Sequence, residues 1–251
     1  MIHSPGEALA RTHTPQAIAH RIAAGNGHSY LGDVILGAID GTVTTFAMVA
    51  GVAGANLPVR VAVILGLTNV FADGLSMAAS NFLSTKSELE LIERARLVEE
   101  FHVDTVPHGE REEVRQIFAG KGFAGELLER VVDVITQDRQ RWIDTMLTEE
   151  HGLRLKPPVP WRAAASTFVA FAIAGQIPLL PLFWSGQMTH DRTFAISTAA
   201  TAIAFFSIGV AKGVITQRRW LLSGLETLAV GGLAAGVAYA VGLLLQTLAI
   251  P

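Results

Sequence analysis

The feature that most constrains this chain is where its charged residues are missing. No Asp, Glu, Lys or Arg occurs in 41–59, 61–72, 74–85, 163–190, 193–211 or 227–251. A membrane crossing needs about 20 predominantly apolar residues, so the pattern predicts five transmembrane helices. We expect them near 34–55, 59–84, 161–184, 193–215 and 221–248. The expected class is an all-α integral membrane protein; a soluble helical protein is the alternative, but it has no ordinary place for an uncharged terminal helix of this length.

A segment of different composition, 86–156, separates the second and third predicted spans. It holds 16 of the 22 acidic residues and 11 of the 19 basic ones, so its net charge is −5, while the rest of the chain carries +2. We therefore expect a soluble helical insertion, preceded by an N-terminal arm at 1–30 and membrane helices at 31–85, and followed by membrane helices at 157–251. An acidic segment argues against nucleic acid as a partner.

The orientation of the chain follows from the basic residues near the span ends. With the N-terminus inside, only Arg60 and Arg192 lie outside, and the other basic residues near span ends lie inside. The arm and the 86–156 insertion are then cytoplasmic and the C-terminus is outside. The absence of a transit-type leader suits a bacterial inner membrane, with an organelle membrane as the alternative.

Two residues inside the predicted spans predict a metal site. Asp40 lies in the first span and Met77 in the second. A carboxylate in a bilayer is costly and marks a functional site, and a thioether beside it suits a transition-metal ion better than Mg²⁺ or Ca²⁺. Metal and proton would compete for the carboxylate oxygens, so exchange of one for the other can follow. The alternative is a carboxylate that packs helices by bonding to Thr42, Thr44 or Ser76.

Residues typical of metal ligands fall at helical spacing in the insertion. We expect the second span to continue to about residue 103, a turn at 104–109, and helices at 110–119, 125–137 and 139–151. Three pairs are three or four residues apart and so share helix faces: Glu99 with His102, Glu110 with Glu113, and Met146 with Glu150. Oxygen, nitrogen and sulfur ligands together suit Fe²⁺, Mn²⁺, Co²⁺ or Zn²⁺. The alternative is a solvated acidic surface with a methionine in the core.

Short motifs in the spans and the insertion occur in the order typical of one family. They are Gly37-Ala38-Ile39-Asp40-Gly41, Ser76-Met77, Asp104-Thr105-Val106-Pro107, Glu150-His151-Gly152-Leu153, Pro178-Leu179-Leu180-Pro181, Ala211-Lys212-Gly213 and Glu226-Thr227. On these motifs the chain resembles the vacuolar iron transporter family over roughly 28–248.

The resemblance implies a homodimeric transporter that moves Fe²⁺, and related divalent metals, out of the cytosol in exchange for protons. The metal is the substrate, so no prosthetic group is expected. Asp40 and Met77 match the family's pore ligands, and the matching ligands of the cytoplasmic domain are Glu99, Glu110, Glu113, Met146 and Glu150. Two positions depart: Asn69 stands where many members carry Glu, and His102 where acidic residues are usual. Asp73, four residues after Asn69 on nearly the same helix face, is the candidate replacement.

Gly37 and Gly41 are spaced as a pair of small residues on the first predicted span. Such a pair lets two helices approach closely. The pair either brings the first spans of two subunits together, as a two-fold pore requires, or relieves packing inside one subunit.

Two other functions fit part of the sequence. A membrane-bound metal sensor or storage protein would use the insertion without needing Asp40. A di-iron carboxylate enzyme of the ferritin-like type needs two Glu-x-x-His motifs and a Glu from each of two further helices. The 86–156 segment contains one such motif, Glu99-Glu100-Phe101-His102, which disfavours the enzyme.

Overall fold

The computed structural model describes residues 12–24 and 29–248, and every regular element in these ranges is a helix. In chain order the helices are α2 Pro15–Ala24, α3 Leu31–Gly54, α4 Val59–Thr105, α5 Pro107–Gly120, α6 Gly125–Thr136, α7 Arg139–Glu149, α8 Pro160–Gln176, the 3-10 helix η1 Leu180–Gln187, α9 His190–Ile215 and α10 Trp220–Leu248. Five are long and apolar enough to cross a membrane: α3, α4, α8 with η1, α9 and α10. The prediction of an all-α integral membrane protein is confirmed.

The chain divides into two compact units. Tyr30–Ser87 and Val159–Pro251 form the membrane unit, while Glu88–Pro158 group with the N-terminal segment in the second unit. Helix α4 contributes residues to both units, because it runs without a break for 47 residues.

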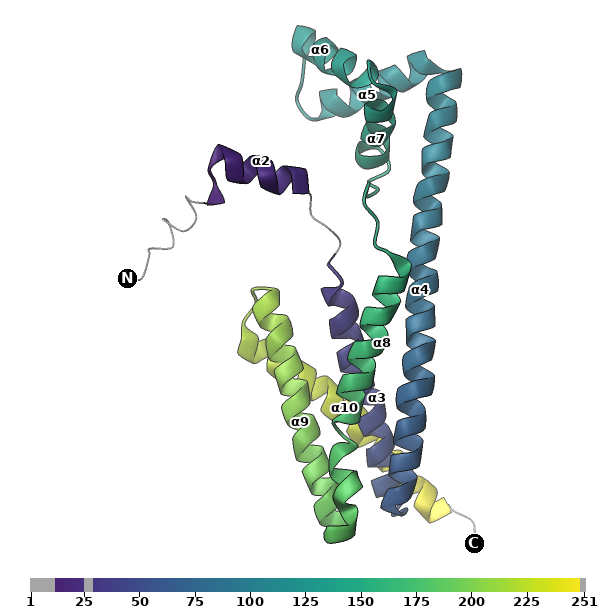
Figure 1. The fold of residues 1–251 in the computed structure, drawn as a ribbon, viewed down its shortest axis with the longest axis vertical. Helices are drawn as coiled ribbons and strands as arrows, with labels where there is room; N and C mark the ends of the chain where they lie inside the picture. Colours follow the sequence, from purple (N-terminus) through teal and green to yellow (C-terminus); the bar gives the residue numbers. More distant parts are fainter. Residues whose placement is uncertain (1–11, 25–28, 249–251) are drawn as a thin grey trace, which may run out of the picture. The chain divides into compact units, whose positions relative to one another are not determined.

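The membrane unit is built around α3. This helix packs against α8 and α10, and α9 packs against α10 (Figure 1). Its buried core joins all five spans through Phe46 of α3, Val70 of α4, Leu179 beside η1, Phe205 of α9 and Ala235 of α10. Many large apolar side chains outside this core are exposed, as expected of helices that face lipid.

The Gly37 and Gly41 pair packs α3 against α8 of the same subunit. A Cβ atom on Gly37 would lie 2.3 Å from the carbonyl oxygen of Thr167, and one on Gly41 would lie 2.4 Å from that of Phe171. Real Cβ atoms do not come so close to backbone, so only glycine permits this helix spacing. Of the two roles left open by the sequence, the structure shows packing inside one subunit.

The turn between α4 and α5 is shorter than the sequence predicts. Helix α4 continues to Thr105 and α5 begins at Pro107, which leaves only Val106 between them, in a non-helical conformation (φ −131°, ψ 54°). The predicted turn at 104–109 and the predicted helix start at 110 are therefore wrong. Proline suits the first position of a helix, since its φ angle is preset and its missing N–H would have had no partner there.

The second unit has its own apolar core beside the end of α4. Val114 of α5, Val132 of α6, and Ile143 and Leu147 of α7 are fully buried in this core. Salt bridges connect the surrounding helices: Arg96 to Asp144 at 2.8 Å, Arg139 to Asp104 at 2.8 Å and Arg115 to Glu129 at 3.0 Å. The core and these ion pairs fix α5 and α7 against the last turns of α4.

Candidate metal centres

Glu99 is the central acidic residue of the second unit. It lies on α4 one helical turn before Val103, which belongs to the apolar core, so its side chain is only 2% exposed. Its Oε1 lies 3.0 Å from Nε2 of His151. Its Oε2 is buried without a hydrogen-bond partner among the described residues. An unsatisfied buried carboxylate oxygen is costly, so this atom is placed to bind a cation.

Glu110 faces Glu99 from the next helix. Because α5 begins at Pro107, Glu110 falls in its first turn and is 3% exposed. The Nδ1 atom of His102 lies 3.3 Å from Oε1 of Glu110 and 4.0 Å from Oε1 of Glu99. The second oxygen of Glu110 is also buried without a hydrogen-bond partner in the described part of the chain. The His102 imidazole thus lies near two carboxylates, and each of them has one buried oxygen without a hydrogen-bond partner among the described residues.

Glu150 and His151 reach this cluster from the end of α7. Their backbone N–H groups both donate to the carbonyl oxygen of Met146, at 3.0 and 3.3 Å. Gly152 then adopts a left-handed conformation (φ 64°), which L side chains rarely adopt, and the chain reverses with Leu153 N–H donating to Leu147 at 2.8 Å. This geometry directs His151 toward Glu99.

The structure brings five ligand-type side chains into two overlapping groups. In each group the ligand atoms lie within 4.8 Å of one another, and Glu99 belongs to both. One group adds Glu150 and His151, and the other adds His102 and Glu110. Carboxylate and neutral imidazole together suit a borderline divalent ion such as Fe²⁺ or Zn²⁺.

Burial and crowding of like charges alter the protonation of these groups. Burial, with Glu113 and Glu99 nearby, raises the pKa of Glu110 to about 7. Burial likewise raises the pKa of Glu150. The hydrogen bond to Glu99 raises the pKa of His151 above its usual value. Protons therefore compete with a metal ion for this site near neutral pH.

Two predicted ligands of the domain are not members of these groups, which comprise only carboxylate and imidazole side chains. Met146 is fully buried in the apolar core beside Ile143 and Leu147. Glu113 is exposed and belongs to neither group, although it is close enough to influence Glu110 electrostatically. For these two residues metal ligation stays a prediction.

His151 is a ligand-type residue of the cluster that helical spacing in the sequence does not predict. Helical spacing considers pairs inside one helix, whereas His151 follows the end of α7 and meets a residue 52 positions earlier. Its position directly after Glu150, before a glycine, is the signal that could have suggested it.

In the membrane unit, the Asp40 carboxylate is half-buried on α3 and has no hydrogen-bond partner among the described residues. The hydroxyl groups of Thr42 and Thr44 donate instead to the backbone oxygens of Ala38 and Asp40, at 2.7 and 2.9 Å. Asp73 of α4 is close enough to repel the Asp40 carboxylate electrostatically. The alternative of a packing carboxylate bonded to threonine is therefore not what the structure shows.

An open groove of about 840 Å³ runs along α4 and reaches α3 and α10. Asn69, Asp73 and Ser76 line it from α4, and Thr44 from α3. The Asn69 amide donates to the Thr44 hydroxyl at 3.2 Å. Met77 is half-buried on α4, four residues after Asp73, and neither it nor Asp40 belongs to the groove lining. Asp73 thus shares the groove with Asn69, the residue that the sequence predicts it to replace.

A second polar network in the spans was not anticipated from the sequence. The amide nitrogen of Asn81 on α4 donates to the Asp33 carboxylate at 2.9 Å and to the Thr167 hydroxyl at 2.7 Å. These contacts connect α4 to the start of α3 and to α8. No sequence spacing links the three residues, because they come from three different helices.

Comparison with known proteins matches residues 31–243 to a family described as the VIT family. The chain is 32% identical over 219 residues to "Vacuolar iron transporter 2" of Oryza sativa subsp. japonica, covering 86% of this chain and 87% of that protein. It is 33% identical over 218 residues to "Vacuolar iron transporter 1" of Arabidopsis thaliana, covering 85% of each. It is 31% identical over 225 residues to "Vacuolar iron transporter" of Toxoplasma gondii, covering 86% of this chain and 74% of that protein.

Proposed function

This chain belongs to the VIT family, and from that premise we propose that it exports Fe²⁺ from the cytosol in exchange for protons. It is a metal-ion transporter and not an enzyme. The observation that best supports the proposal is the pair of buried carboxylates, Glu99 and Glu110, each with an orphaned oxygen beside an imidazole. Mn²⁺, Co²⁺ and Zn²⁺, which accept the same ligands, are the further substrates we propose.

The first step is capture of the ion by the 86–156 segment. Glu99 contributes to both ligand groups, so an ion bound there gains ligands from α4, α5 and the end of α7. Glu110, with a pKa of about 7, carries a proton in much of the population at neutral pH. Arrival of a dication releases that proton, since the charged carboxylate becomes the favoured form.

The second step is passage through the spans. The Asp40 carboxylate has no cationic partner among the described residues, and Asp73 repels it. In a bilayer this charge must be neutralised, either by a proton or by a metal ion. Alternate occupation of Asp40 by proton and metal is the exchange that we propose. Asn69 carries no charge and cannot exchange a proton for a metal ion. We propose that the Asp73 carboxylate does so in its place, and that Met77 supplies a soft ligand.

A homodimer is the assembly that we propose. Ser76 is exposed and Asp73 half-buried at the open groove of a single subunit. Polar groups that face lipid lack the hydrogen bonds that water would provide, and this is costly. A second copy packed on this face of α4 would enclose the groove and turn it into a path for ions.

A sensor or storage protein, the alternative, would use the same ligand groups of the insertion but would not move the ion through the spans. The di-iron enzyme is disfavoured by the single Glu-x-x-His motif of 86–156. Transport itself therefore separates the remaining candidates.

The test uses the full-length protein in liposomes of low internal pH, with Fe²⁺ added outside. We expect iron to accumulate inside while protons leave, and we expect accumulation to stop when an ionophore collapses the pH gradient. Empty liposomes with the same gradient are the control. Iron that binds to the protein without entering the lumen would instead support the sensor.

A further inference from the structure

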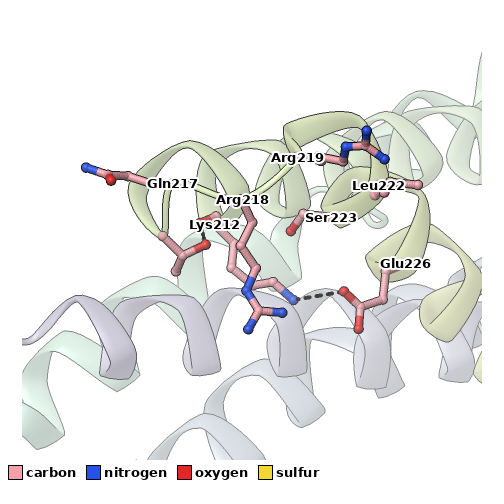
Figure 2. A pocket seen from close by; sticks show the side chains of 8 residues that line it. Lys212, Gln217, Arg218, Arg219, Leu222, Ser223 and Glu226 are labelled. Atoms are coloured by element: carbon pink, nitrogen blue, oxygen red, sulfur yellow. Dashed lines mark hydrogen bonds and ion pairs between the residues drawn. The ribbon is translucent and has the colours of Figure 1, made fainter.

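A separate pocket of about 680 Å³ lies at the turn between α9 and α10. Figure 2 shows three basic side chains around it, those of Lys212, Arg218 and Arg219, together with Ser223 and Glu226. None of these residues belongs to the proposed metal sites. The pocket is therefore a candidate for a ligand other than the transported ion.

The charge of this pocket is predominantly positive. Lys212 pairs with Glu226 at 3.5 Å, but the Glu226 side chain is 69% exposed (Figure 2). The guanidinium groups of Arg218 and Arg219 have no ion pair or hydrogen bond within the described part of the chain. Three cations with one acidic neighbour leave an excess positive charge that attracts an anion.

The backbone of the turn strengthens this preference. Gln217 has a positive φ of 54°, and Arg218 N–H donates to Gly213 at 2.8 Å, so the chain reverses tightly into α10. The first N–H groups of a helix lack intrahelical partners and carry partial positive charge. Helix α10 begins at Trp220 and therefore starts at the edge of the pocket.

Ser223 provides a second, independent indication of a ligand. The residue is 5% exposed, and its Oγ has no hydrogen-bond partner among the described residues. A buried hydroxyl without a partner is uncommon. Ser223 lines the pocket one turn into α10, where a bound anion would give this hydroxyl an acceptor.

The surroundings of the pocket favour a lipid over a free anion. Trp220, Leu221 and Leu222 are about half exposed beside the basic residues. The turn lies at the same end of the membrane unit as the starts of α3 and α8 (Figure 1), which the basic residues assign to the cytoplasm. Tryptophan at a membrane interface and basic pockets between spans are features of contact with anionic lipid headgroups.

We propose that this pocket binds the phosphate group of an anionic phospholipid of the cytoplasmic leaflet, with Arg218 and Arg219 as the main contacts. The shared chemistry is that of a phosphate anion, and inorganic phosphate is the soluble source to be distinguished. The proposal goes beyond metal transport and does not depend on the identity of the metal.

The experiment measures lipid binding to the full-length protein in neutral detergent, by native mass spectrometry and by thermal unfolding. The probes are phosphatidylglycerol, phosphatidylcholine and inorganic phosphate. The variants are Arg218→Gln with Arg219→Gln, Glu226→Gln and Ser223→Ala. The matched control is Arg60→Gln with Arg192→Gln, which removes the same charge from exposed positions elsewhere.

We expect phosphatidylglycerol to bind and stabilise the wild type, with phosphatidylcholine and phosphate inert. The double arginine variant should bind phosphatidylglycerol about 25-fold more weakly, since each basic side chain near an anionic lipid contributes about fivefold. Ser223→Ala should bind a few-fold more weakly, and the control pair should match the wild type. Glu226→Gln should bind more tightly, an increase that a misfolded variant cannot give.

Equal binding by the wild type and the double arginine variant would overturn the proposal, as would equal losses in the control pair. Stabilisation by inorganic phosphate alone, to the same extent as by phosphatidylglycerol, would assign the pocket to a soluble anion and overturn the lipid.

Discussion

The carboxylates proposed to bind metal have opposite surroundings in the two units of this protein. In the 86–156 segment, Glu99 and Glu110 are buried with an imidazole nitrogen within 3.0 to 3.3 Å of each. In the spans, Asp40 has no such partner in the described structure and is repelled by Asp73. The first arrangement holds its ligands in place before metal arrives, which favours capture. The second leaves a charge that any cation relieves, which favours passage.

Asp40→Asn should have the largest effect, because it removes the carboxylate proposed to carry the ion through the spans. The amide keeps the shape of the side chain and removes its charge, so transport in liposomes should fall by roughly 100-fold or more, because a metal ion crossing the bilayer loses the carboxylate that neutralises it. Metal binding by the 86–156 segment should stay unchanged. Asp191→Asn, at an exposed position of α9, is the control. Transport at the wild-type rate would contradict the role of Asp40.

Glu99→Gln tests the other unit, because Glu99 is shared by both ligand groups. The metal affinity of the full-length protein should fall by roughly 100-fold. A metal excess of about 100-fold over the dissociation constant stabilises a protein by about 2.7 kcal/mol, and the variant should lose this stabilisation at the same metal concentration. Calorimetry and thermal unfolding measure both effects. The exposed Glu93→Gln on α4 should leave both unchanged.

The raised pKa of Glu110 predicts how pH acts on the metal-free segment. Its pKa is about 7 in the fold against 4.5 when unperturbed, so the folded state holds more protons than the unfolded state between these values. The free energy of unfolding should therefore fall as pH rises from about 4.5 to 7, by up to about 3 kcal/mol.

Trp142 is the one tryptophan of the 88–158 unit. Its fluorescence reports the unfolding of this unit in urea when the other tryptophans are replaced by Phe and metal is removed with a chelator. Glu110→Gln should flatten the dependence on pH. Metal affinity should change in the opposite direction and rise with pH, because fewer protons then occupy Glu110 and His151. A stability that is constant across this range would contradict the predicted titration of Glu110.

His151→Ala measures what the unanticipated ligand contributes. Loss of one of several ligands should weaken Zn²⁺ or Co²⁺ binding about tenfold, in the range seen for groups that support a metal site. The exposed His108→Ala on α5 removes the same side chain away from the cluster and is the control. Equal affinity in both variants would restrict His151 to its hydrogen bond with Glu99.

Met77→Leu is expected to have the smallest effect. It keeps the volume and removes the sulfur, so transport of Fe²⁺ or Co²⁺ should decrease a few-fold while that of the harder Mn²⁺ changes less. Met188→Leu, outside the helices, is the control. Equal losses for all metals would indicate that Met77 contributes packing.

The spans were predictable because hydrophobicity is a property of the local sequence. The uncharged stretches placed all five membrane helices. The start of α5 was predicted wrongly, because Pro107 was assigned to a turn although it occupies the first position of the helix. Helical spacing also identified Glu99 with His102 as a pair on one face, which the structure shows converging near Glu110.

Which ligand side chains from different helices come together was decided only by tertiary packing. Spacing treats Met146 and Glu150 alike, yet packing of α7 buries the first in the apolar core and brings the second to the edge of the ligand cluster. His151 enters the cluster because Gly152 reverses the chain against α4. The sequence determined which chemical groups each helix carries, since periodicity acts within one element. Which of them meet depends on contacts between different helices, such as that of Glu99 with His151, 52 positions later, and only the folded core sets these contacts.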